Sequence, residues 1–298
     1  MLRNWSGRSR GVLTLLSLLA MAAVPGVSKA DFDFNRDGYS DLLFQNRATG
    51  DVYDTLMNGT TGISGDFMIR GEDTNWKIVA APDINGDGEA DLVWQNEATG
   101  DVWYSILDGV NLSAGDYLIR GMDLDWKIVG SADLFNNNGI DILWQNQRSG
   151  DVYYSPLNGA VLENGDYIFQ GVDTHQKIRA VTSTGDPNNP GIELIWQDDA
   201  NGDISYTDLN GTRMTDSAYL RQGEDPAWVV AGTSVLSGIG HTDLILQNTN
   251  TGDVYGSPLM GTYLEAGGYL FNGIDTNWKL VGLNSQSYAT RVGRAPRK

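Results

Sequence analysis

Two stretches of the chain carry oxygen-bearing side chains at a spacing suited to a metal ion. They run 33–41 (D-F-N-R-D-G-Y-S-D) and 83–91 (D-I-N-G-D-G-E-A-D), and both have the form D-x-N-x-D-G-x-x-D. Calcium takes about six to eight oxygen ligands, and side chains at positions 1, 3 and 5 of a loop turned by glycine at position 6 converge on one ion. Three carboxylates crowded in each loop repel one another unless a cation lies between them. The spacing therefore predicts two calcium sites.

The expected ligands are the side chains at positions 1, 3, 5 and 9 and the backbone carbonyl at position 7. The first loop supplies Asp33, Asn35, Asp37, Tyr39 and Asp41, and the second loop supplies Asp83, Asn85, Asp87, Glu89 and Asp91. An acidic turn that binds nothing is the alternative interpretation of both loops.

Three later stretches at the same place have lost ligands, so we expect two ions rather than five. The third has Phe135 at position 3 and Asn138 in place of the turn glycine, and the fifth has Val235 at position 1. Only the last acid persists in all three, as Asp141, Glu193 and Asp243. This persistence predicts that the last acid also binds the backbone at the start of the following strand.

The loops belong to a unit of about 50 residues that occurs five times. The phrase T-G-D-V or one of its variants, S-G-D-V and N-G-D-I, recurs with its glycine at 50, 100, 150, 202 and 252, and W-K-I-V or a variant begins at Trp76, Trp126, Gln176, Trp228 and Trp278. The two extra residues of the fourth unit fall in the polar stretch Thr182–Pro190, where a surface loop tolerates an insertion.

Each unit has the pattern of four short strands separated by turn residues. In the second unit these are Lys77–Ala81, Leu92–Gln95, Val102–Leu107 and Tyr117–Arg120. One such sheet cannot bury both faces alone and must pack on neighbours around a ring. The chain is therefore expected to be all-β, a five-bladed β-propeller of four-stranded antiparallel blades. Because the first unit lacks its first strand, the surplus C-terminal stretch Trp278–Gly282 should pair beside Leu42–Gln45 and close the ring.

Two polar positions recur in every unit and suit structural roles. Carboxylates two residues after a glycine are placed to accept backbone N–H bonds, at Asp73, Asp123, Asp173, Asp225 and Asp275. Glutamines end the second strand of each unit, at Gln45, Gln95, Gln145, Gln197 and Gln247. A buried amide there would satisfy backbone groups of the adjacent blade, and the alternative is that the glutamines line a ligand cleft.

These motifs resemble the FG-GAP or VCBS-type repeat, the calcium-loop propeller blade also present in integrin α-subunit heads and in some fungal and bacterial lectins. The resemblance covers residues 31 to about 284 and is carried by the loop-plus-strand segments D-L-L-F-Q-N (Asp41–Asn46) and D-L-V-W-Q-N (Asp91–Asn96). It implies that the Asp and Asn side chains of the two loops bind calcium. The chain departs from the family in lacking the Phe-Gly and Gly-Ala-Pro pieces and in having five units where relatives often have seven.

The first 30 residues have the pattern of a secretory signal peptide. Three arginines precede an apolar run at 11–24, and small residues at Ser28 and Ala30 favour cleavage before Asp31. A retained membrane anchor is the alternative, but the run is short for the ~20 residues that span a bilayer. The expected domains are therefore a signal peptide at 1–30, a propeller at 31–284 and a basic tail at 285–298. The mature protein is expected to be secreted or periplasmic, with no membrane span.

Composition excludes several classes of function. Lys and Arg number 20 against 38 Asp and Glu, and removing the leader leaves 16 against 38, a formal charge of −22. Such a surface repels phosphate backbones, so we expect no nucleic-acid partner. The absence of cysteine excludes disulfides, thiolate nucleophiles and Cys-ligated metals.

The leading functional hypothesis is a calcium-stabilised, non-catalytic recognition or adhesion module for carbohydrate or extracellular protein. Aromatic residues beside the third strand, above all Tyr104, Tyr154 and Tyr206, are the candidate ligand platforms. The strand-two indoles Trp94, Trp144 and Trp196 are expected instead to pack between blades.

Two further classes stay open. A secreted glycosidase or lyase would need two acids at a fixed separation in different environments, and no unique pair interrupts the repeats. His175 and His241 fit ordinary loops. A docking subunit of an exported assembly would use the parts that break the repeat or the basic tail, whose alternative is a solvated end.

Overall fold

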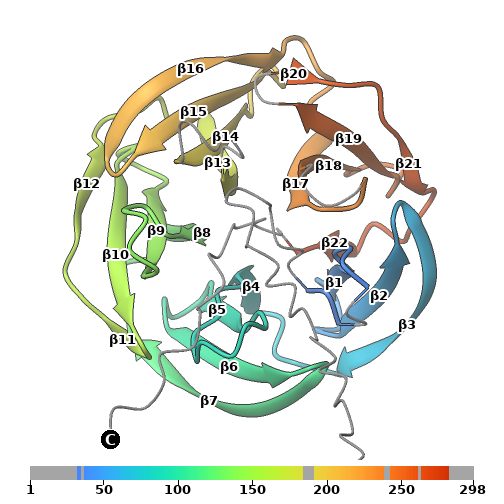
Figure 1. Cartoon of the computed structure of the whole chain (residues 1–298), viewed down its shortest axis with the longest axis horizontal. Helices are drawn as coiled ribbons and strands as arrows, with labels where there is room; N and C mark the ends of the chain where they lie inside the picture. The colour runs from blue at the N-terminus through green and yellow to red at the C-terminus, as the bar shows by residue number, and fades with distance from the viewer. Residues whose placement is uncertain (1–31, 35–36, 184–190, 238–241, 261–262, 282–298) are drawn as a thin grey trace, which may run out of the picture.

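Five antiparallel sheets stand as blades around a central axis in the computed structural model (Figure 1). The structure describes residues 32–34, 37–183, 191–237, 242–260 and 263–281. The expected all-β, five-bladed propeller is confirmed, including its closure by the C-terminal strand. The predicted leader, Asn35, His241 and the basic tail lie outside the described residues.

Each blade runs from an innermost to an outermost strand. Blade one comprises β22 (Trp278–Leu280), β1 (Leu42–Asn46), β2 (Val52–Asn58) and β3 (Thr61–Ile69). Blade two comprises β4 (Trp76–Ala80), β5 (Leu92–Asn96), β6 (Val102–Asp108) and β7 (Asn111–Ile119). Blade three comprises β8 (Trp126–Ala132), β9 (Ile140–Asn146), β10 (Val152–Asn158), β11 (Val161–Leu162) and β12 (Asp166–Phe169).

Blades four and five complete the ring. Blade four comprises β13 (Gln176–Ser183), β14 (Ile192–Asp198), β15 (Ile204–Asn210) and β16 (Arg213–Arg221). Blade five comprises β17 (Trp228–Ser234), β18 (Thr242–Asn248), β19 (Val254–Met260), β20 (Tyr263–Leu264) and β21 (Gly268–Phe271).

The second strand of every blade is covered on both faces by neighbouring blades, which is why three apolar residues in a row, such as Leu42–Phe44 and Leu92–Trp94, precede its glutamine. All five residues of β1 and of β5 are buried. The outermost strands instead face solvent over most of their length, as in β7, where the first four residues are exposed.

Proline explains why the outer strand is broken in blades three and five. Pro156 in β10 and Pro258 in β19 stand where blades one and two have Leu56 and Ile106. Proline has no N–H to donate to an outer partner. The outer strand therefore divides into two short pieces, β11 and β12 or β20 and β21, on the same neighbour.

The T-G-D turn is held by contacts that recur in all five units. Asp51 Oδ1 accepts a hydrogen bond from the Gly71 N–H at 2.7 Å, and the four equivalent pairs are alike. Gly50 has φ +76°, and a Cβ there would lie 1.8 Å from the Glu72 carbonyl oxygen. The phrase recurs because only glycine fits this close approach.

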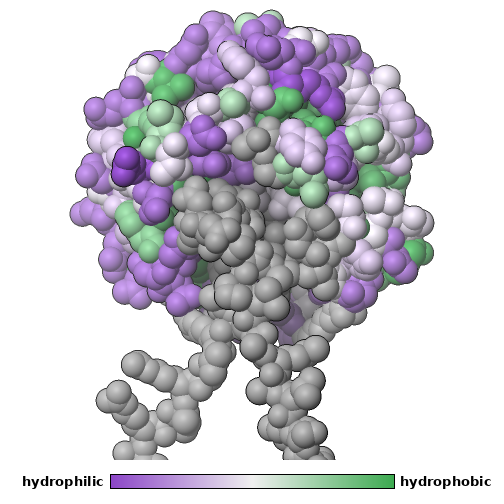
Figure 2. All heavy atoms as spheres, turned by 45° about the horizontal axis from the view of Figure 1, so that its top comes forward, coloured by the Kyte–Doolittle hydropathy of each residue, from purple (hydrophilic) through white to green (hydrophobic). Residues whose placement is uncertain are grey.

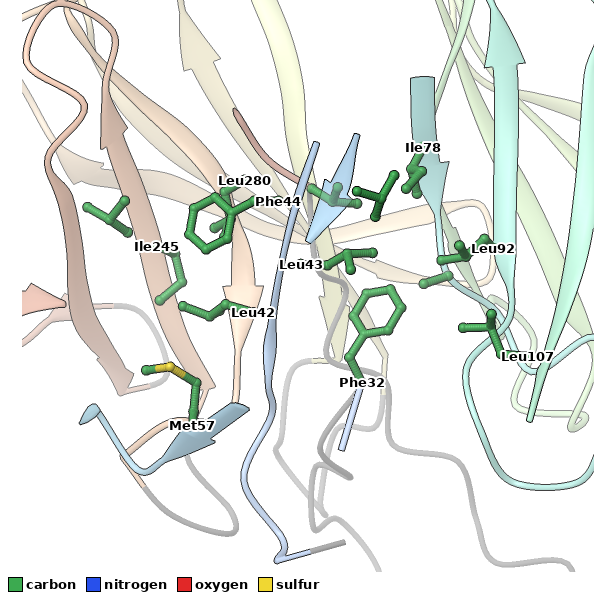
Figure 3. Packing of buried hydrophobic residues seen from close by; sticks show 14 of the residues in the cluster. Phe32, Leu42, Leu43, Phe44, Met57, Ile78, Leu92, Leu107, Ile245 and Leu280 are labelled. Carbon is green, nitrogen blue, oxygen red and sulfur yellow. The ribbon is translucent and has the colours of Figure 1, made fainter. Parts of the chain in front are cut away.

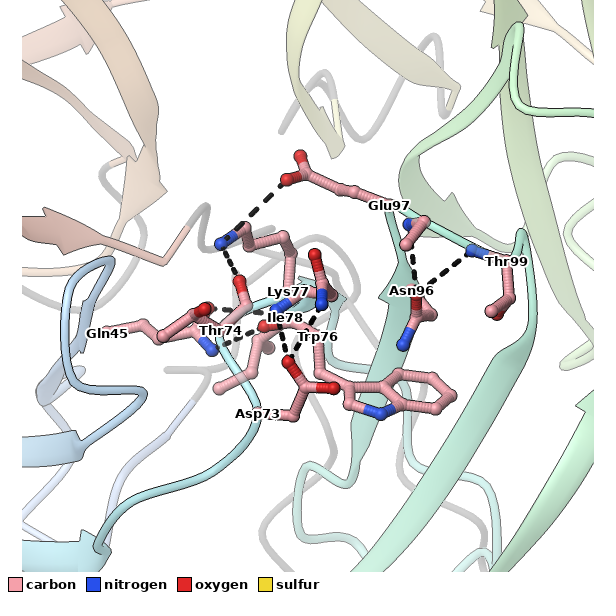
Figure 4. A network of polar contacts seen from close by, with 11 residues as sticks. Gln45, Asp73, Thr74, Trp76, Lys77, Ile78, Asn96, Glu97 and Thr99 are labelled. Atoms are coloured by element: carbon pink, nitrogen blue, oxygen red, sulfur yellow. Dashed lines mark hydrogen bonds and ion pairs between the residues drawn. The ribbon is translucent and has the colours of Figure 1, made fainter.

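The recurring glutamines join neighbouring blades, as expected. Gln45 Nε2 donates to the Trp76 carbonyl at 2.8 Å, and its Oε1 accepts the Ile78 N–H at 3.3 Å (Figure 4). The same two bonds leave Gln95, Gln145, Gln197 and Gln247 for the first strand of the next blade. The recurring Asp73 set also behaves as predicted, since each accepts the N–H two residues ahead.

The ring is sealed between the two ends of the repeat array. β22 pairs antiparallel with β1, with Phe44 opposite Leu280. Gln247 of blade five holds β22 as the other glutamines hold their neighbours, by bonds of 2.9 and 3.1 Å. Residues of blades five, one and two, among them Ile245, Leu43 and Leu92, then share one apolar core (Figure 3).

Candidate functional site

The second loop folds around the carboxylate of Asp83. Its Oδ1 accepts the N–H groups of Gly86 and Asp87 at 2.7 and 3.0 Å, and its Oδ2 accepts the Gly88 N–H at 2.9 Å. Asn85 Nδ2 donates to Asp87 Oδ2 at 2.7 Å. The side chains of positions 1, 3 and 5 are thus brought together on one side of the loop.

The first loop has the same skeleton. Asp33 accepts the N–H groups of Asp37 and Gly38 at 2.9 and 3.0 Å, and Asp37 Oδ1 accepts the Tyr39 N–H at 2.9 Å. Gly38 has φ +91° and its counterpart Gly88 has φ +92°, a conformation that favours glycine. Both turn glycines therefore serve the geometry that the motif predicts.

The last acid of each loop accepts backbone N–H groups, as predicted, but the donors lie in the loop and in the second strand after it rather than at the start of the following strand. Asp41 accepts the Phe34 and Met57 N–H groups at 2.8 and 2.7 Å, and so links the loop to strand β2. Asp91 accepts the Ile84 and Leu107 N–H groups at 2.8 and 2.9 Å. Burial raises the pKa of Asp91 to about 6, and these hydrogen bonds oppose the rise.

The donor set of both loops suits a hard cation, because it consists of carboxylate, amide and carbonyl oxygens. Within the described part of the chain, no three His, Cys, Asp or Glu side chains gather closely enough to hold a metal ion by themselves. Coordination would thus need the amide and carbonyl oxygens too. In the structure the negative charge of the Asp87 carboxylate is stabilised by a hydrogen bond from the Asn85 amide. A cation between Asp83 and Asp87 would neutralise that charge directly.

In the third loop an aromatic contact stands where the other loops have a ligand. Asp133 accepts the Asn137 and Asn138 N–H groups at 3.0 and 2.8 Å, so the skeleton is kept. Phe135, at position 3, packs on Tyr154 with ring centroids 5.2 Å apart. An aromatic contact therefore occupies the position of one ligand in this loop.

Clusters of aromatic rings lie across the strands near the T-G-D end of four blades. In blade five, Trp228, Tyr255 and Tyr269 have ring centroids 5.4–6.4 Å apart. Blades one to three have equivalent clusters, around Trp278, Tyr53 and Phe67, around Trp76, Trp103 and Tyr117, and around Trp126, Tyr153 and Tyr167. In blade four, Gln176 and Ser205 take the places of the inner two rings.

The outermost ring of these clusters is covered in the blades where an arginine follows the outer strand. Arg70 lies 3.6 Å over the Phe67 ring, and Arg120 lies 3.4 Å over the Tyr117 ring. Blades three to five have Gln170, Gln222 and Asn272 instead, and their outer tyrosines are exposed, at Tyr167 (43%), Tyr219 (58%) and Tyr269 (59%). Three blades thus present a bare tyrosine ring to solvent.

The three tyrosines predicted as ligand platforms lie on different blades and form no single site. Tyr104 and Tyr154 are half-buried in blades two and three. Tyr206 is only 3% exposed, and its hydroxyl donates to Asp216 Oδ2 at 2.8 Å. Its ring face is not free to stack on a ligand. Trp94, Trp144 and Trp196 are 1–5% exposed, so their expected place in the core is confirmed.

Blade four contains a row of acids that the sequence reasoning missed. Glu193, Asp208 and Asp216 are direct neighbours across β14, β15 and β16. Burial raises the pKa of Glu193 well above 4.5 and that of Asp208 to about 6, and each is raised further by the next carboxylate. Asp208 could have been noticed, because the equivalent residues are Leu56, Ile106, Pro156 and Pro258.

We expect Glu193→Gln to stabilise the protein at neutral and higher pH. Because the pKa of Glu193 is raised on folding, the native state binds this proton more tightly than the unfolded state does. Stability is therefore lost as pH rises from about 4.5 through the folded pKa, and glutamine removes that loss. Thermal melts from pH 5 to 8 should show a Tm a few degrees higher at pH 8 and a flatter profile.

The matched control for Glu193→Gln is Glu265→Gln, which removes the same charge from an exposed residue. Its profile should follow the wild type. An unchanged pH profile in the Glu193→Gln variant would show that the buried carboxyl does not titrate differently on folding.

Comparison with protein-family models matches residues 33–94, the first loop through the second strand of blade two, to the FG-GAP-like repeat. The chain carries an FG-GAP-like repeat in a β-propeller fold. A search of curated proteins gives no match to this chain.

Several solved structures resemble this chain, among them the following two. One is a chain in a crystal structure of a nidogen/laminin complex, at 13% identity and a TM-score of 0.48, covering 82% of this chain and 97% of that one. The other is the Dos1 propeller, at 11% identity and a TM-score of 0.35, covering 77% of this chain and 59% of that one. Neither resemblance identifies a ligand or a partner of this chain.

In the described ranges, no helix is long and apolar enough to span a membrane. His175 lies exposed in a loop, with Nδ1 3.0 Å from Asp173 Oδ1. This is the ordinary loop position expected for it.

Proposed function

We propose that this FG-GAP propeller is an exported, calcium-stabilised recognition module that binds carbohydrate without catalysing a reaction. The observation that carries the proposal is the set of bare tyrosine rings, Tyr167, Tyr219 and Tyr269, on the outer strands of three adjacent blades. A flat ring offers an apolar face to the C–H groups of a sugar. Neighbouring polar groups can then bind its hydroxyls.

The charge and hydropathy of the molecular surface suit a neutral polar ligand. The formal charge of −18 disfavours polyanions, and the face in Figure 2 is mostly hydrophilic with apolar residues in small separate patches. Isolated apolar patches of this kind fit small contact areas better than one large protein interface. This favours carbohydrate over an extracellular protein as the ligand.

Catalysis is not part of the proposal. Glycoside hydrolysis needs two carboxyl groups that both reach the substrate. In the acid row of blade four, Glu193 is only 4% exposed, so a substrate does not reach it. The raised pKa values there are accounted for by burial and like-charge contact.

Calcium is proposed as a structural ion held by the two loops. Asp33, Asp37 and Asp41, with Asn35, would hold one ion, and Asp83, Asn85, Asp87 and Asp91 the other. The carbonyls of Tyr39 and Glu89 are the expected backbone ligands. The shared hydrogen-bond skeleton of the two loops supports this assignment.

A glycan array and a pull-down on insoluble polysaccharides test the proposal. The mature chain in calcium should bind at least one neutral glycan, and chelation should weaken the binding because the scaffold loses stability. Failure to bind any glycan while an extracellular protein is captured would favour the protein alternative. Turnover of a polysaccharide in the same panel would favour the enzyme alternative.

A further inference from the structure

A cavity lies between blades four and five, at the T-G-D end of the ring. It has a volume of about 180 Å³ and is lined by Arg221, Glu224, Trp228, Leu246, Tyr255 and Tyr269. Arg221 ends the outer strand of blade four and Glu224 lies in the loop that follows it, whereas the other four residues come from blade five. The site thus spans one junction between consecutive units.

The cavity forms where two residues break the repeat opposite each other. Arg221 stands where the other four units have Ile69, Ile119, Phe169 and Phe271. Leu246 stands where they have Phe44, Trp94, Trp144 and Trp196.

At the other junctions these two positions fill the space between blades. Phe169 packs on Trp196 with centroids 6.2 Å apart, and Phe271 packs on Phe44 at 5.9 Å. Ile69 shares a core with Trp94, and Ile119 shares one with Trp144. Only the junction of blades four and five pairs a charged residue with a smaller aliphatic one. Large aromatic volume is missing there, which accounts for the cavity.

The cavity is lined by an apolar aromatic surface and by one pair of oppositely charged side chains. Trp228, Tyr255 and Tyr269 supply the aromatic surface, and Leu246 is 2% exposed. Arg221 Nη1 donates to Glu224 Oε2 at 2.6 Å, and both side chains stay partly accessible. A guanidinium beside a carboxylate presents hydrogen-bond donors and acceptors side by side, as neighbouring sugar hydroxyls require.

The size of the cavity and the charges on its walls restrict the class of ligand that it can bind. It is smaller than the ~300–1,000 Å³ of pockets for drug-sized molecules, so it suits one ring. An anion would meet Glu224 within a strongly acidic chain, and a cation would meet Arg221. A neutral ring with hydroxyls on its edge and C–H groups on its face meets neither penalty.

We propose that this cavity binds one neutral pyranose unit of a glycan, stacked on the aromatic rings, with its hydroxyls bonded to Arg221 and Glu224. This assignment rests on the proposed carbohydrate function and places the binding site in the molecule. It also predicts that this kind of site is specific to the junction of blades four and five, because at the other junctions, as far as the structure describes them, these two positions pack between the blades.

Calorimetric titration with methyl glycosides of glucose, galactose, mannose and N-acetylglucosamine tests the site. At least one should bind the full chain. The double variant Arg221→Ile, Leu246→Trp restores the residues found at Ile69 and Trp94 and should weaken binding by at least about tenfold. Should overpacking prevent its folding, Tyr269→Ala, at an exposed ring, should weaken binding of the same glycoside by a similar factor.

The matched controls are Arg213→Ile and Tyr263→Ala, which change the same residue types at exposed positions outside the cavity. Both should bind like the wild type. Undiminished binding by the double variant and by Tyr269→Ala would overturn the site while leaving the carbohydrate function standing. Selective binding of glucuronate or tetramethylammonium, or of none of these small molecules, would also overturn it. The glycan array tests the carbohydrate function independently of this site.

Discussion

Ending the chain at Asp275 should abolish the folded propeller. This removes β22 and exposes one whole edge of β1, whose five residues are all buried. Leu280 and Val281 are 6% and 4% exposed, and burial of each contributes about 1.5–3 kcal/mol. The two seam bonds of Gln247 and the ring contacts of Trp278 are lost as well. Because total stability is about 5–15 kcal/mol, circular dichroism should show a chain without a cooperative melt.

A milder change measures the same seam in a chain that still folds. Leu280→Ala should lower the free energy of unfolding by about 2–5 kcal/mol, since it opens a cavity in a packed core. Leu112→Ala, at a leucine that is 43% exposed in β7, is the matched control and should cost no more than about 0.5 kcal/mol. Equal effects of the two substitutions would mean that the seam does not support the ring.

Chelation of calcium should lower the Tm by several degrees. An ion at 100 times its dissociation constant stabilises the folded state by about 2.7 kcal/mol per site, and each kcal/mol is worth roughly 2–4 °C for a domain of this size. Asp87→Ala should shrink the difference between calcium and chelator by about half, because it disables one of two similar loops. Differential scanning calorimetry with and without chelator gives the comparison.

The control for the calcium prediction is Asp116→Ala in β7 of the same blade, which removes one carboxylate outside the loops. Its response to chelation should equal that of the wild type. Identical melting curves with calcium and with chelator would remove both proposed sites.

The ring could be predicted from the sequence because its determinants repeat. The Gly-Asp pair of the turn and the strand-ending glutamine each occur five times, which indicates one shared structural role for each. The structure places Gln45 and its equivalents at the blade junctions. The surplus C-terminal strand followed from counting the units. Loop geometry followed from aspartate and glycine at set spacings, as Asp83 and Gly88 show.

The outer strands were predicted less well. The fourth strand of the second unit was expected at 117–120 and is observed at Asn111–Ile119. Its first four residues face solvent, so no alternation of apolar and polar residues marks them. Pairing with β6 determines this strand. The breaks in blades three and five depend on Pro156 and Pro258 in the neighbouring strand rather than on the broken strand itself.

Ligand platforms could not be chosen from residue type alone. Tyr206 resembles Tyr104 and Tyr154 in the repeat but is buried by its bond to Asp216. Conversely, the cavity depends on Arg221 and Leu246, which lie 25 positions apart and come together only across a blade junction. Aligning the five units by hand would single out both residues as misfits. Their meeting in space depends on the ring geometry, which brings the outer strand of one blade beside the second strand of the next.

In this account, repeated residues build the ring and the broken repeat at one junction binds the ligand. The most direct measurement is the indole N–H spectrum of the ¹⁵N-labelled protein, with Trp228 assigned by Trp228→Phe, during titration with a glycoside that binds. The signal of Trp228 should shift, while those of its repeat equivalents Trp76, Trp126 and Trp278 stay in place. Equal shifts of all four signals, or a shift confined to the other three, would contradict the account.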